Sequence, residues 1–346
     1  MSKIFITGVT GYIGGNVLHL LRKSHPEYHV RALVRDASKG AAITEKYSQV
    51  QIVNGGLDDT ETIAQEAKDA DVVVHLAATG HLKSVQTIYE ALSSKPKSSY
   101  YIQISGASAL AAGELADKSR VFGSADDVIH NDLSGVGAIK SLIKEYPSRA
   151  VDNFMFSVAE KQSHVKTALV VPPIIYGQGR GPGNQRSIQI PGLANAVLKR
   201  QRGLQVGPGE SRWGNIHIED LSRIFLLLVE KAVEGNQDEN IWGANGIFFT
   251  AAGEVSFGEI SRRIAVAAHD FNLIPSEEVD SVDAKEIDDL IPHGSVLLGT
   301  NARSGAHRAE AVLGWEPEME SLEDNIPTVV IEEAQALGMK VDLWTA

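Results

Sequence analysis

The apolar residues of the first 175 positions follow two alternating patterns. Short runs of apolar and β-branched residues predict six buried strands, at Lys3–Thr7, His29–Val34, Val50–Val53, Asp71–Leu76, Tyr100–Ile104 and Val165–Val171. The segments between them carry apolar residues at helical spacing and predict helices at Tyr12–Lys23, Ser38–Tyr47, Thr60–Lys68, Leu82–Leu92 and Gly135–Ser163. Strands that alternate with helices are typical of a parallel sheet covered on both faces. The pattern therefore predicts an α/β, doubly wound fold.

The pattern changes after Val171. The stretch Pro172–Gly183 is rich in glycine and proline and predicts a loop that leaves the sheet. Beyond it we expect helices at Pro191–Arg202, Glu219–Val233, Ser256–Ala268 and Leu322–Leu337, and one short strand at Gly246–Thr250. We therefore expect a first domain over residues 1–176, with returning elements at about 216–250, and a smaller, mixed C-terminal lobe over residues 177–215 and 251–346.

A glycine-rich turn joins the first strand to the first helix, in the sequence Thr-Gly-Val-Thr-Gly-Tyr-Ile-Gly. Gly8 permits a tight turn, Gly11 lets the backbone approach a pyrophosphate, and Gly14 allows close packing of helix on strand. The first helical turn then directs backbone amides and the positive end of its dipole at the anion, around Thr10, Tyr12 and Ile13. Because strand and helix flank the turn, we interpret it as a dinucleotide site in a Rossmann domain; a plain glycine-rich turn is the alternative.

The end of the second strand distinguishes between two cofactors. An NAD site needs a carboxylate there for the ribose hydroxyls. Val34 occupies that position and Arg35 follows, and a guanidinium can clamp a 2′-phosphate. Lys39 could add a second positive charge to the site that Arg35 forms. We expect NADP(H); in the alternative, NAD(H) binds through Asp36 and Arg35 is a solvated loop residue.

Composition narrows the function classes. The 346 residues carry a net charge of −12 and no basic stripe, which argues against a nucleic-acid partner. The absence of cysteine excludes disulfides and thiolate chemistry, and the 11 histidines lack ligand spacing, so we predict no metal site. No apolar stretch approaches the roughly 20 residues that span a bilayer, and residues 1–7 do not form a signal peptide. We expect a cytoplasmic protein without a membrane partner.

Further motifs occur in a fixed order after the glycine turn: Gly56–Asp59, His75–Ala78, Ser105, Pro172–Gly177, His217–Asp220 and Leu313–Pro317. Together they resemble the extended short-chain dehydrogenase/reductase superfamily, in its NAD-dependent epimerase/dehydratase-like branch, over nearly the whole chain. The resemblance implies a smaller lobe that binds a small-molecule substrate, partly through residues 177–187 and 207–215, and a homodimer formed through two helices. It also implies cofactor contacts at Leu57 with the adenine, at Leu76, Ala77 and Ala78 with ribose and phosphates, and at Pro173, Ile174 and Ile175 near the nicotinamide.

The catalytic pattern of that family is broken in this chain. The family uses a Ser/Thr–Tyr–Lys set with Tyr-x-x-x-Lys on a helix, and this motif is absent. Ser105 fits the first role, although it could merely cap a loop. Counting back from the sixth strand places Arg149 near the lysine position and Tyr146 one residue from the tyrosine position, if a helix starts at Pro147. We expect Ser105, Tyr146 and Arg149 to form the catalytic set; Tyr146 as a packing residue and His81 as the acid are alternatives.

These features predict an NADP(H)-dependent oxidoreductase that transfers hydride on a small carbonyl or alcohol compound. Two alternatives stay open. One is an epimerase, dehydratase or isomerase of the same fold. The other is a non-catalytic NADP(H)-binding sensor, because the catalytic set is degenerate.

Overall fold

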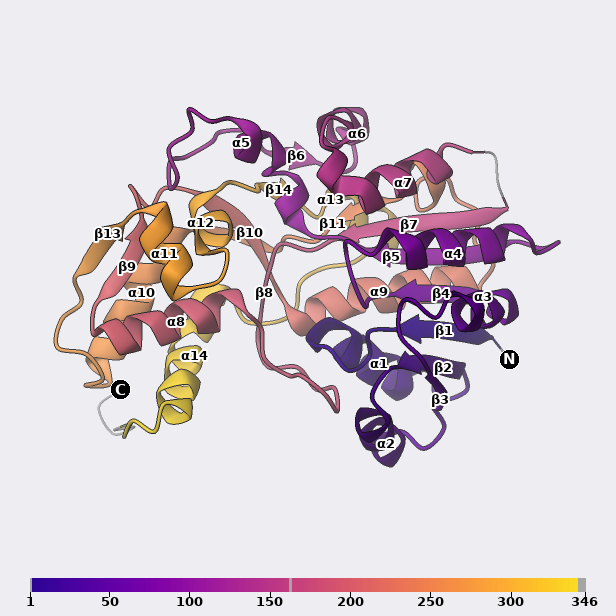
Figure 1. The fold of residues 1–346 in the computed structure, drawn as a ribbon, viewed down its shortest axis with the longest axis horizontal. Coiled ribbons are helices and arrows are strands. Elements are labelled where there is room, and N and C mark those ends of the chain that lie inside the picture. Colours follow the sequence, from indigo (N-terminus) through magenta and orange to yellow (C-terminus); the bar gives the residue numbers. More distant parts are fainter. Residues whose placement is uncertain (1, 162–163, 342–346) are drawn as a thin grey trace.

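A computed structural model describes residues 2–161 and 164–341, and its centre is a parallel sheet (Figure 1). The sheet has seven strands in the order β11-β7-β5-β4-β1-β2-β3. These strands are β1 (Lys3–Thr7), β2 (His29–Val34), β3 (Gln51–Asn54), β4 (Val72–His75), β5 (Ser99–Ile104), β7 (Val165–Val171) and β11 (Ile247–Phe249). All six predicted strands occur, and the short strand predicted at 246–250 adds the seventh. The predicted doubly wound fold is confirmed.

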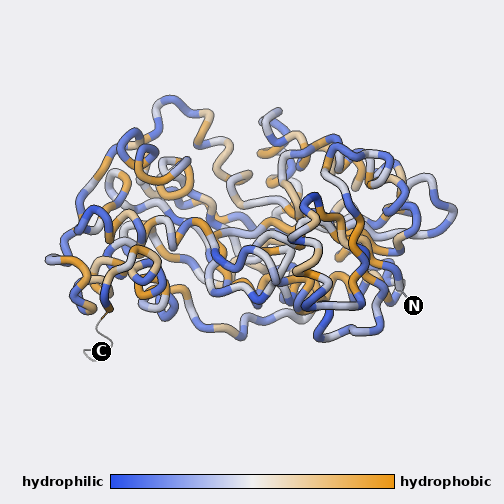
Figure 2. The backbone as a smooth tube through the Cα atoms, turned by 60° about the horizontal axis from the view of Figure 1, so that its bottom comes forward, coloured by the Kyte–Doolittle hydropathy of each residue, from blue (hydrophilic) through white to orange (hydrophobic). Residues whose placement is uncertain are grey.

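Helices cover both faces of this sheet. One face carries α3 (Thr60–Asp69), α4 (Leu82–Ser93), α6 (Val136–Lys144) and α7 (Ala150–Ala159), and the other carries α1 (Tyr12–Ser24), α2 (Ala37–Lys46), α9 (Ile218–Val233) and α13 (His307–Leu313). On β1, Phe5 packs in the hydrophobic core on the α3–α4 face of the sheet, whereas Ile4 and Ile6 pack in the core on the α1–α9 face. Burial on both faces explains why the strands are continuous apolar runs, which Figure 2 shows as hydrophobic stretches inside the fold.

The prediction of a single long helix over Gly135–Ser163 is wrong in one respect. The structure divides it into α6, a short 3₁₀ turn at Pro147–Arg149 and α7, and residues 162–163 lie outside the described residues. Pro147 lacks a backbone N–H and restricts the residue before it, so Tyr146 is extended, with φ −114° and ψ 98°. A new helix therefore starts directly after Arg149.

The rest of the chain forms smaller sheets and a second group of helices (Figure 1). The strands are β6 (His130–Asn131), β8 (Ile174–Tyr176), β9 (Gly203–Val206), β10 (Arg212–His217), β12 (Gly253–Ser256), β13 (Val279–Val282) and β14 (Ser304–Gly305). The helices are α5 (Ala112–Ala116), α8 (Gln189–Arg200), α10 (Phe257–Asp270), α11 (Ala284–Leu290), α12 (Gly294–Gly299) and α14 (Leu322–Ala336). Helices α8, α10 and α14 pack on one another. The domain division expected from the sequence stays a prediction.

Two of the sequence motifs pack together, although they are distant in the chain. The buried carboxylate of Asp220 accepts hydrogen bonds from the backbone N–H groups of Glu318 (3.0 Å) and Met319 (3.1 Å). The indole of Trp315 donates to the Asp220 carbonyl at 3.0 Å. These bonds fix the segment before α14 against α9, so both motifs are structural.

Among residues 2–161 and 164–341, no helix has the length and apolar character required to cross a bilayer.

Candidate functional site

The glycine turn has the geometry that its sequence predicts. Gly8 has φ +82°, and a Cβ atom there would lie 2.6–2.7 Å from backbone atoms of Leu76 and Ala77. A Cβ on Gly14 would lie 2.3 Å from the Gly8 carbonyl oxygen. Helix α1 begins at Tyr12, immediately after the turn. The turn therefore approaches the end of β4 at Gly8, and α1 approaches the turn at Gly14, at distances that only glycine allows.

A pocket of about 260 Å³ opens above this turn. It is lined by Thr7, Gly8, Thr10, Gly11, Leu33, Val34, Arg35, Gly55, Gly56, Leu57, Leu76 and Ala77. The structure thus brings together seven of the predicted cofactor-binding residues, which come from the four loops that follow β1, β2, β3 and β4: Gly8, Thr10, Gly11, Arg35, Leu57, Leu76 and Ala77. A backbone cradle that a Cβ would fill, at the N-terminus of a helix, suits the diphosphate of a dinucleotide.

Arg35 and Asp36, the two candidates for cofactor selection, differ in what they contact. The Arg35 side chain is exposed, and its Cδ lies 3.7 Å from where a Cβ on Gly56 would be, at the pocket wall. Asp36 caps α2: its Oδ1 accepts hydrogen bonds from the Ser38 hydroxyl (2.6 Å), the Ser38 N–H (2.8 Å) and the Lys39 N–H (3.3 Å). These bonds hold the pKa of Asp36 below its usual value. Lys39 is exposed in the first turn of α2.

The remaining predicted cofactor residues lie outside the pocket lining. The Tyr12 hydroxyl donates to the carbonyls of Tyr176 (3.0 Å) and Gly177 (2.5 Å), so this side chain is turned toward β8. Ile13 packs against the α1–α9 cluster, and Gln103 Nε2 donates to the Ala78 carbonyl at 3.4 Å. Ile174 and Ile175 begin β8, with Ile175 half-buried, and Pro173 directly precedes this strand.

The loop from Gly177 to the start of α8 folds down onto α1 and α2 (Figure 1). Asn184 N–H donates to the Thr10 carbonyl at 3.1 Å, and Lys46 Nζ donates to the Arg180 carbonyl at 2.6 Å. A larger hollow of about 1010 Å³ lies between this loop and α14, but its lining does not include Ser105. Arg186, which lines it, is ion-paired with Glu333 at 2.6 Å. The loop therefore braces the glycine turn from outside.

Beneath the turn lies a buried histidine in a chain of hydrogen bonds. Thr7 Oγ1 is 2.6 Å from His75 Nδ1 and accepts from the Leu76 N–H at 3.2 Å. On the other side of the ring, His75 Nε2 is hydrogen-bonded to Ser84 Oγ at 3.1 Å. Burial, and secondly the charge of His81, lower the pKa of His75 to about 3. His75 is neutral in the folded protein and ties β1, β4 and α4 together.

We expect the free energy of unfolding to fall as the pH drops below about 6.5. Below this pH, His75 binds a proton in the unfolded chain but stays neutral in the folded protein. Between pH 6.5 and pH 5 this loss is about 1.6 kcal/mol, because the slope reaches about 1.4 kcal/mol per pH unit only below the unfolded-state pKa. Urea unfolding of the wild type and His75→Asn at several pH values measures it. The variant should be less stable overall but have a shallower slope; equal slopes would contradict the assignment.

A second cluster forms where β5 ends, around Ser105. The Ser105 N–H donates to the Val170 carbonyl at 2.7 Å, which holds the residue at the carboxyl edge of the sheet. The Ser105 hydroxyl donates to Asp152 Oδ1 at 2.5 Å. Arg149 Nε donates to Asp152 Oδ2 at 2.7 Å, while its Nη2 reaches Ser105 Oγ at 3.2 Å and its Nη1 reaches Ser108 Oγ at 3.4 Å. Two of the three predicted catalytic residues therefore meet, joined by a carboxylate.

Tyr146 is placed differently from the other two. Its hydroxyl lies 3.1 Å from where a Cβ on Gly113 would be, beside α5, and its carbonyl accepts from Asn153 Nδ2 at 3.2 Å. No hydrogen bond among the described residues joins it to Ser105. Its role as acid/base stays a prediction. The residue that the sequence interpretation missed is Asp152; its signal was an acidic residue three positions after Arg149, in a helix that carries no other charged residue.

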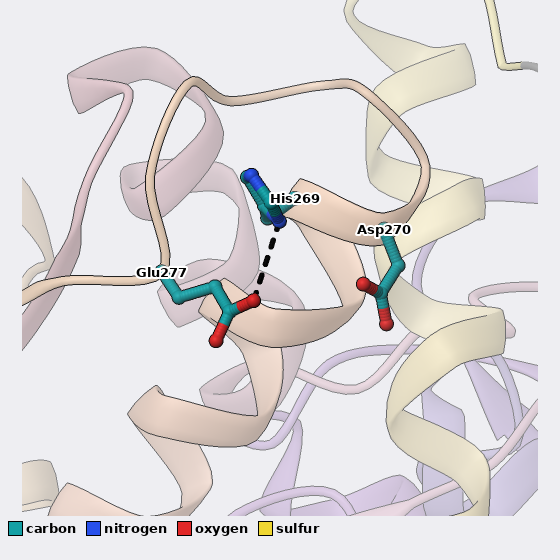
Figure 3. Close-up of side chains that lie close together, drawn as sticks. All are labelled: His269, Asp270 and Glu277. Carbon is teal, nitrogen blue, oxygen red and sulfur yellow. Dashed lines mark ion pairs between the residues drawn. The ribbon is translucent and has the colours of Figure 1, made fainter.

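One group of described residues has donor atoms close enough to hold a metal: His269, Asp270 and Glu277 (Figure 3). It lies at the end of α10 and in the loop that follows. His269 Nδ1 and Glu277 Oε1 are 3.3 Å apart and form an ion pair. The side chains are on the surface, where such acidic groups commonly occur without a metal, so we assign no metal site to them.

Comparisons with known proteins agree with this architecture. The model of the NmrA-like family matches residues 1–91, and that of the NAD dependent epimerase/dehydratase family matches residues 110–242. The chain is 34% identical to oxidase ucsJ of Acremonium sp, over 98% of this chain and 99% of that protein.

Two solved structures share the fold at low sequence identity. UDP-glucuronic acid 4-epimerase from Bacillus cereus, in complex with UDP-glucuronic acid and NAD, aligns with a TM-score of 0.63 and 18% identity over 96% of this chain and 99% of that one. dTDP-glucose 4,6-dehydratase from Bacillus anthracis, in complex with NAD, aligns with a TM-score of 0.64 and 15% identity over 97% of both chains.

Proposed function

Because the chain belongs to the extended short-chain dehydrogenase/reductase superfamily, in its NAD-dependent epimerase/dehydratase-like branch, we propose that it is an NADP(H)-dependent oxidoreductase acting on a small carbonyl or alcohol compound. The observation that carries the proposal is the contact of Ser105 with Arg149 at the sheet edge that also carries the glycine turn. A hydroxyl and a guanidinium side by side suit a substrate oxygen whose charge changes during the reaction.

The predicted site residues other than Lys39 have the following places in this proposal. Backbone amides around Thr10, Gly11, Tyr12 and Ile13 would hold the diphosphate, with Gly8 and Gly14 shaping the cradle. Leu57 and Arg35 would hold the adenosine end; Leu76, Ala77 and Ala78 would line the path to the nicotinamide, which Pro173, Ile174 and Ile175 would approach. The bound nicotinamide supplies the hydride donor or acceptor. Ser105 and Arg149 orient the substrate oxygen. The sequence predicts Tyr146 as the acid/base, but among the described residues no hydrogen bond joins Tyr146 to Ser105.

The preference for NADP(H) rests on Arg35. Asp36 already accepts three hydrogen bonds through Oδ1 as the cap of α2, which supports Arg35 as the residue facing the adenosine ribose. We expect Arg35→Ala to weaken NADP⁺ binding about tenfold or more and to change NAD⁺ binding little, because only NADP⁺ carries the 2′-phosphate. Isothermal titration calorimetry with both nucleotides measures this.

Lys39→Ala is the matched control for the Arg35 variant, since it removes a second exposed cation of the same region. We expect it to have the smaller effect. Equal affinity of wild type and Arg35→Ala for NADP⁺ would remove the NADP assignment and favour NAD(H).

The reaction type is tested by spectrophotometry at the nicotinamide absorbance. NADPH with aldehydes, ketones and quinones, and NADP⁺ with the corresponding alcohols, should show net oxidation or reduction of the nucleotide. Tight binding without turnover of any kind would instead favour the sensor function. The proposal includes a cytoplasmic location, a small-molecule substrate and a homodimer.

One observation favours a second candidate function, an epimerase, dehydratase or isomerase. The loop after β8 is bonded to the glycine turn and to α2, through Asn184 and Lys46, in a manner that would slow cofactor exchange. Enzymes that regenerate their cofactor in each cycle do not need exchange. Product formation without a net change in nicotinamide absorbance would identify this function.

A further inference from the structure

We propose that Asp152 is the terminal proton acceptor of this site and acts through the Ser105 hydroxyl, so that the enzyme oxidises an alcohol with a serine–aspartate relay in place of a tyrosine. The inference rests on the proposed function and deepens it. It assigns to the proton transfer a residue that the sequence did not indicate.

The hydrogen-bond directions around Ser105 carry the inference. Its hydroxyl proton points to Asp152 Oδ1 at 2.5 Å, and one of its lone pairs faces Arg149 Nη2 at 3.2 Å. A hydroxyl has one proton and two lone pairs, so what Ser105 can still offer a substrate is a lone pair. Ser105 in this state accepts a proton and does not donate one, which suits the O–H group of an alcohol.

The surroundings of Asp152 suit a proton acceptor. The side chain is buried, and Arg149 is the charged side chain in contact with it. Burial raises the pKa of Asp152, while the charge of Arg149 and the hydrogen bond from Ser105 lower it. From α6, the charged groups Lys140 and Lys144 pair instead with Glu160, beyond the end of α7, and from α4 the ring of Tyr89 packs on Phe154.

The proposed step moves two protons and one hydride. The alcohol O–H bond breaks and its proton passes to Ser105 Oγ, while the Ser105 proton passes to Asp152. The carbinol C–H bond breaks with its electron pair, the alcohol becomes a carbonyl, and the oxidised nicotinamide is the two-electron acceptor. Arg149 stabilises the negative charge that develops on the substrate oxygen. The proton on Asp152 is then released to water.

The first test is the pH profile of alcohol oxidation with NADP⁺, using primary, secondary and benzylic alcohols as probes. The wild-type rate should fall on the acid side as Asp152 becomes protonated. Asp152→Asn should lower kcat about 100-fold, leave KM within about threefold and remove the acid limb. Asp152→Glu should restore part of kcat, and the fall in rate on the acid side should occur at a different pH than in the wild type.

Asp220→Asn is the matched control, because Asp220 is an equally buried helix carboxylate that accepts backbone hydrogen bonds away from the site. It should lose stability and keep the acid limb. An Asp152→Asn variant that keeps kcat within threefold, or keeps the limb at the wild-type pH, would overturn the inference. A wild type that binds no nucleotide or transfers no hydride refutes the proposed function, which is a different result.

The second test needs neither substrate nor turnover. In protein labelled with ¹³C at aspartate carboxyls, the Asp152 signal, assigned by its loss in Asp152→Glu, should titrate above the usual aspartate range. Ser105→Ala should move it further up, because a hydrogen bond to the carboxylate is lost. A pKa in the ordinary range that does not respond to Ser105→Ala would overturn the inference even if Asp152→Asn fails to fold.

Discussion

Gly8→Ala should abolish dinucleotide binding and lower the free energy of unfolding by about 3 kcal/mol. Gly8 is held at φ +82°, where a side chain is strained, and a Cβ would meet the carbonyl carbon and oxygen of Leu76 at 2.6 Å and the Ala77 nitrogen at 2.7 Å. These are backbone atoms at the end of β4, in the middle of the sheet, and they cannot rotate away. The turn must move as a whole, and with it the amides that would hold the diphosphate.

Urea unfolding and calorimetry with NADP⁺ and NAD⁺ measure the two effects of Gly8→Ala. Gly80→Ala is the control, because Gly80 lies in the loop after the same strand and a Cβ there has no atom within 4 Å. It should bind nucleotide as the wild type does. If Gly8→Ala still bound nucleotide with unchanged affinity, the dinucleotide site would not be at this turn.

Ser105→Ala should reduce kcat about 100-fold while nucleotide affinity changes little. The hydroxyl lies between Asp152 Oδ1 and Arg149 Nη2, so its loss removes both the contact to a substrate oxygen and the link to the carboxylate. The backbone bond of Ser105 to Val170 does not involve the side chain and survives the substitution. Steady-state kinetics on the substrate found by the panel, with calorimetry for the nucleotide, separate the two effects.

Two neighbouring variants make the Ser105 experiment specific. Ser108→Ala removes a hydroxyl that contacts the same arginine at 3.4 Å, and we expect a much smaller loss. Tyr146→Phe tests the residue predicted from the sequence as acid/base, and an unchanged kcat would remove it from the mechanism. Ser105→Ala with wild-type kcat would exclude this cluster as the reaction centre.

The strands and the first helices were predictable because their signal is local. A strand buried on both faces must be apolar at nearly every position, as β4 is, and the helices between the strands show the 3.6-residue period. The glycine turn was equally predictable from the sequence, since its conformation depends on a few adjacent residues. The error at Gly135–Ser163 had a local cause too, because Pro147 breaks the pattern and residues 150–159 resume it.

The arrangement around Ser105 was only half predictable. The position of Ser105 after a strand and the count back to Arg149 indicated two members of the cluster, but neither indicated Asp152. Whether an acidic residue on a helix faces solvent or the core depends on how that helix is rotated against its neighbours. Helix α7 follows the 3₁₀ turn at Pro147–Arg149, and in the folded chain its Asp152 side chain meets Ser105.

The order of apolar runs, helical periods and glycines along the chain is enough to specify a doubly wound sheet and the turn at its centre, because each of these features is decided within a few consecutive residues. Two arrangements required the folded chain: the descent of residues 177–188 onto α1, and the contact of Asp152 with Ser105 across 47 positions. Both depend on atoms from distant segments that meet only when the core packs, and packing depends on the shapes of all the elements at once.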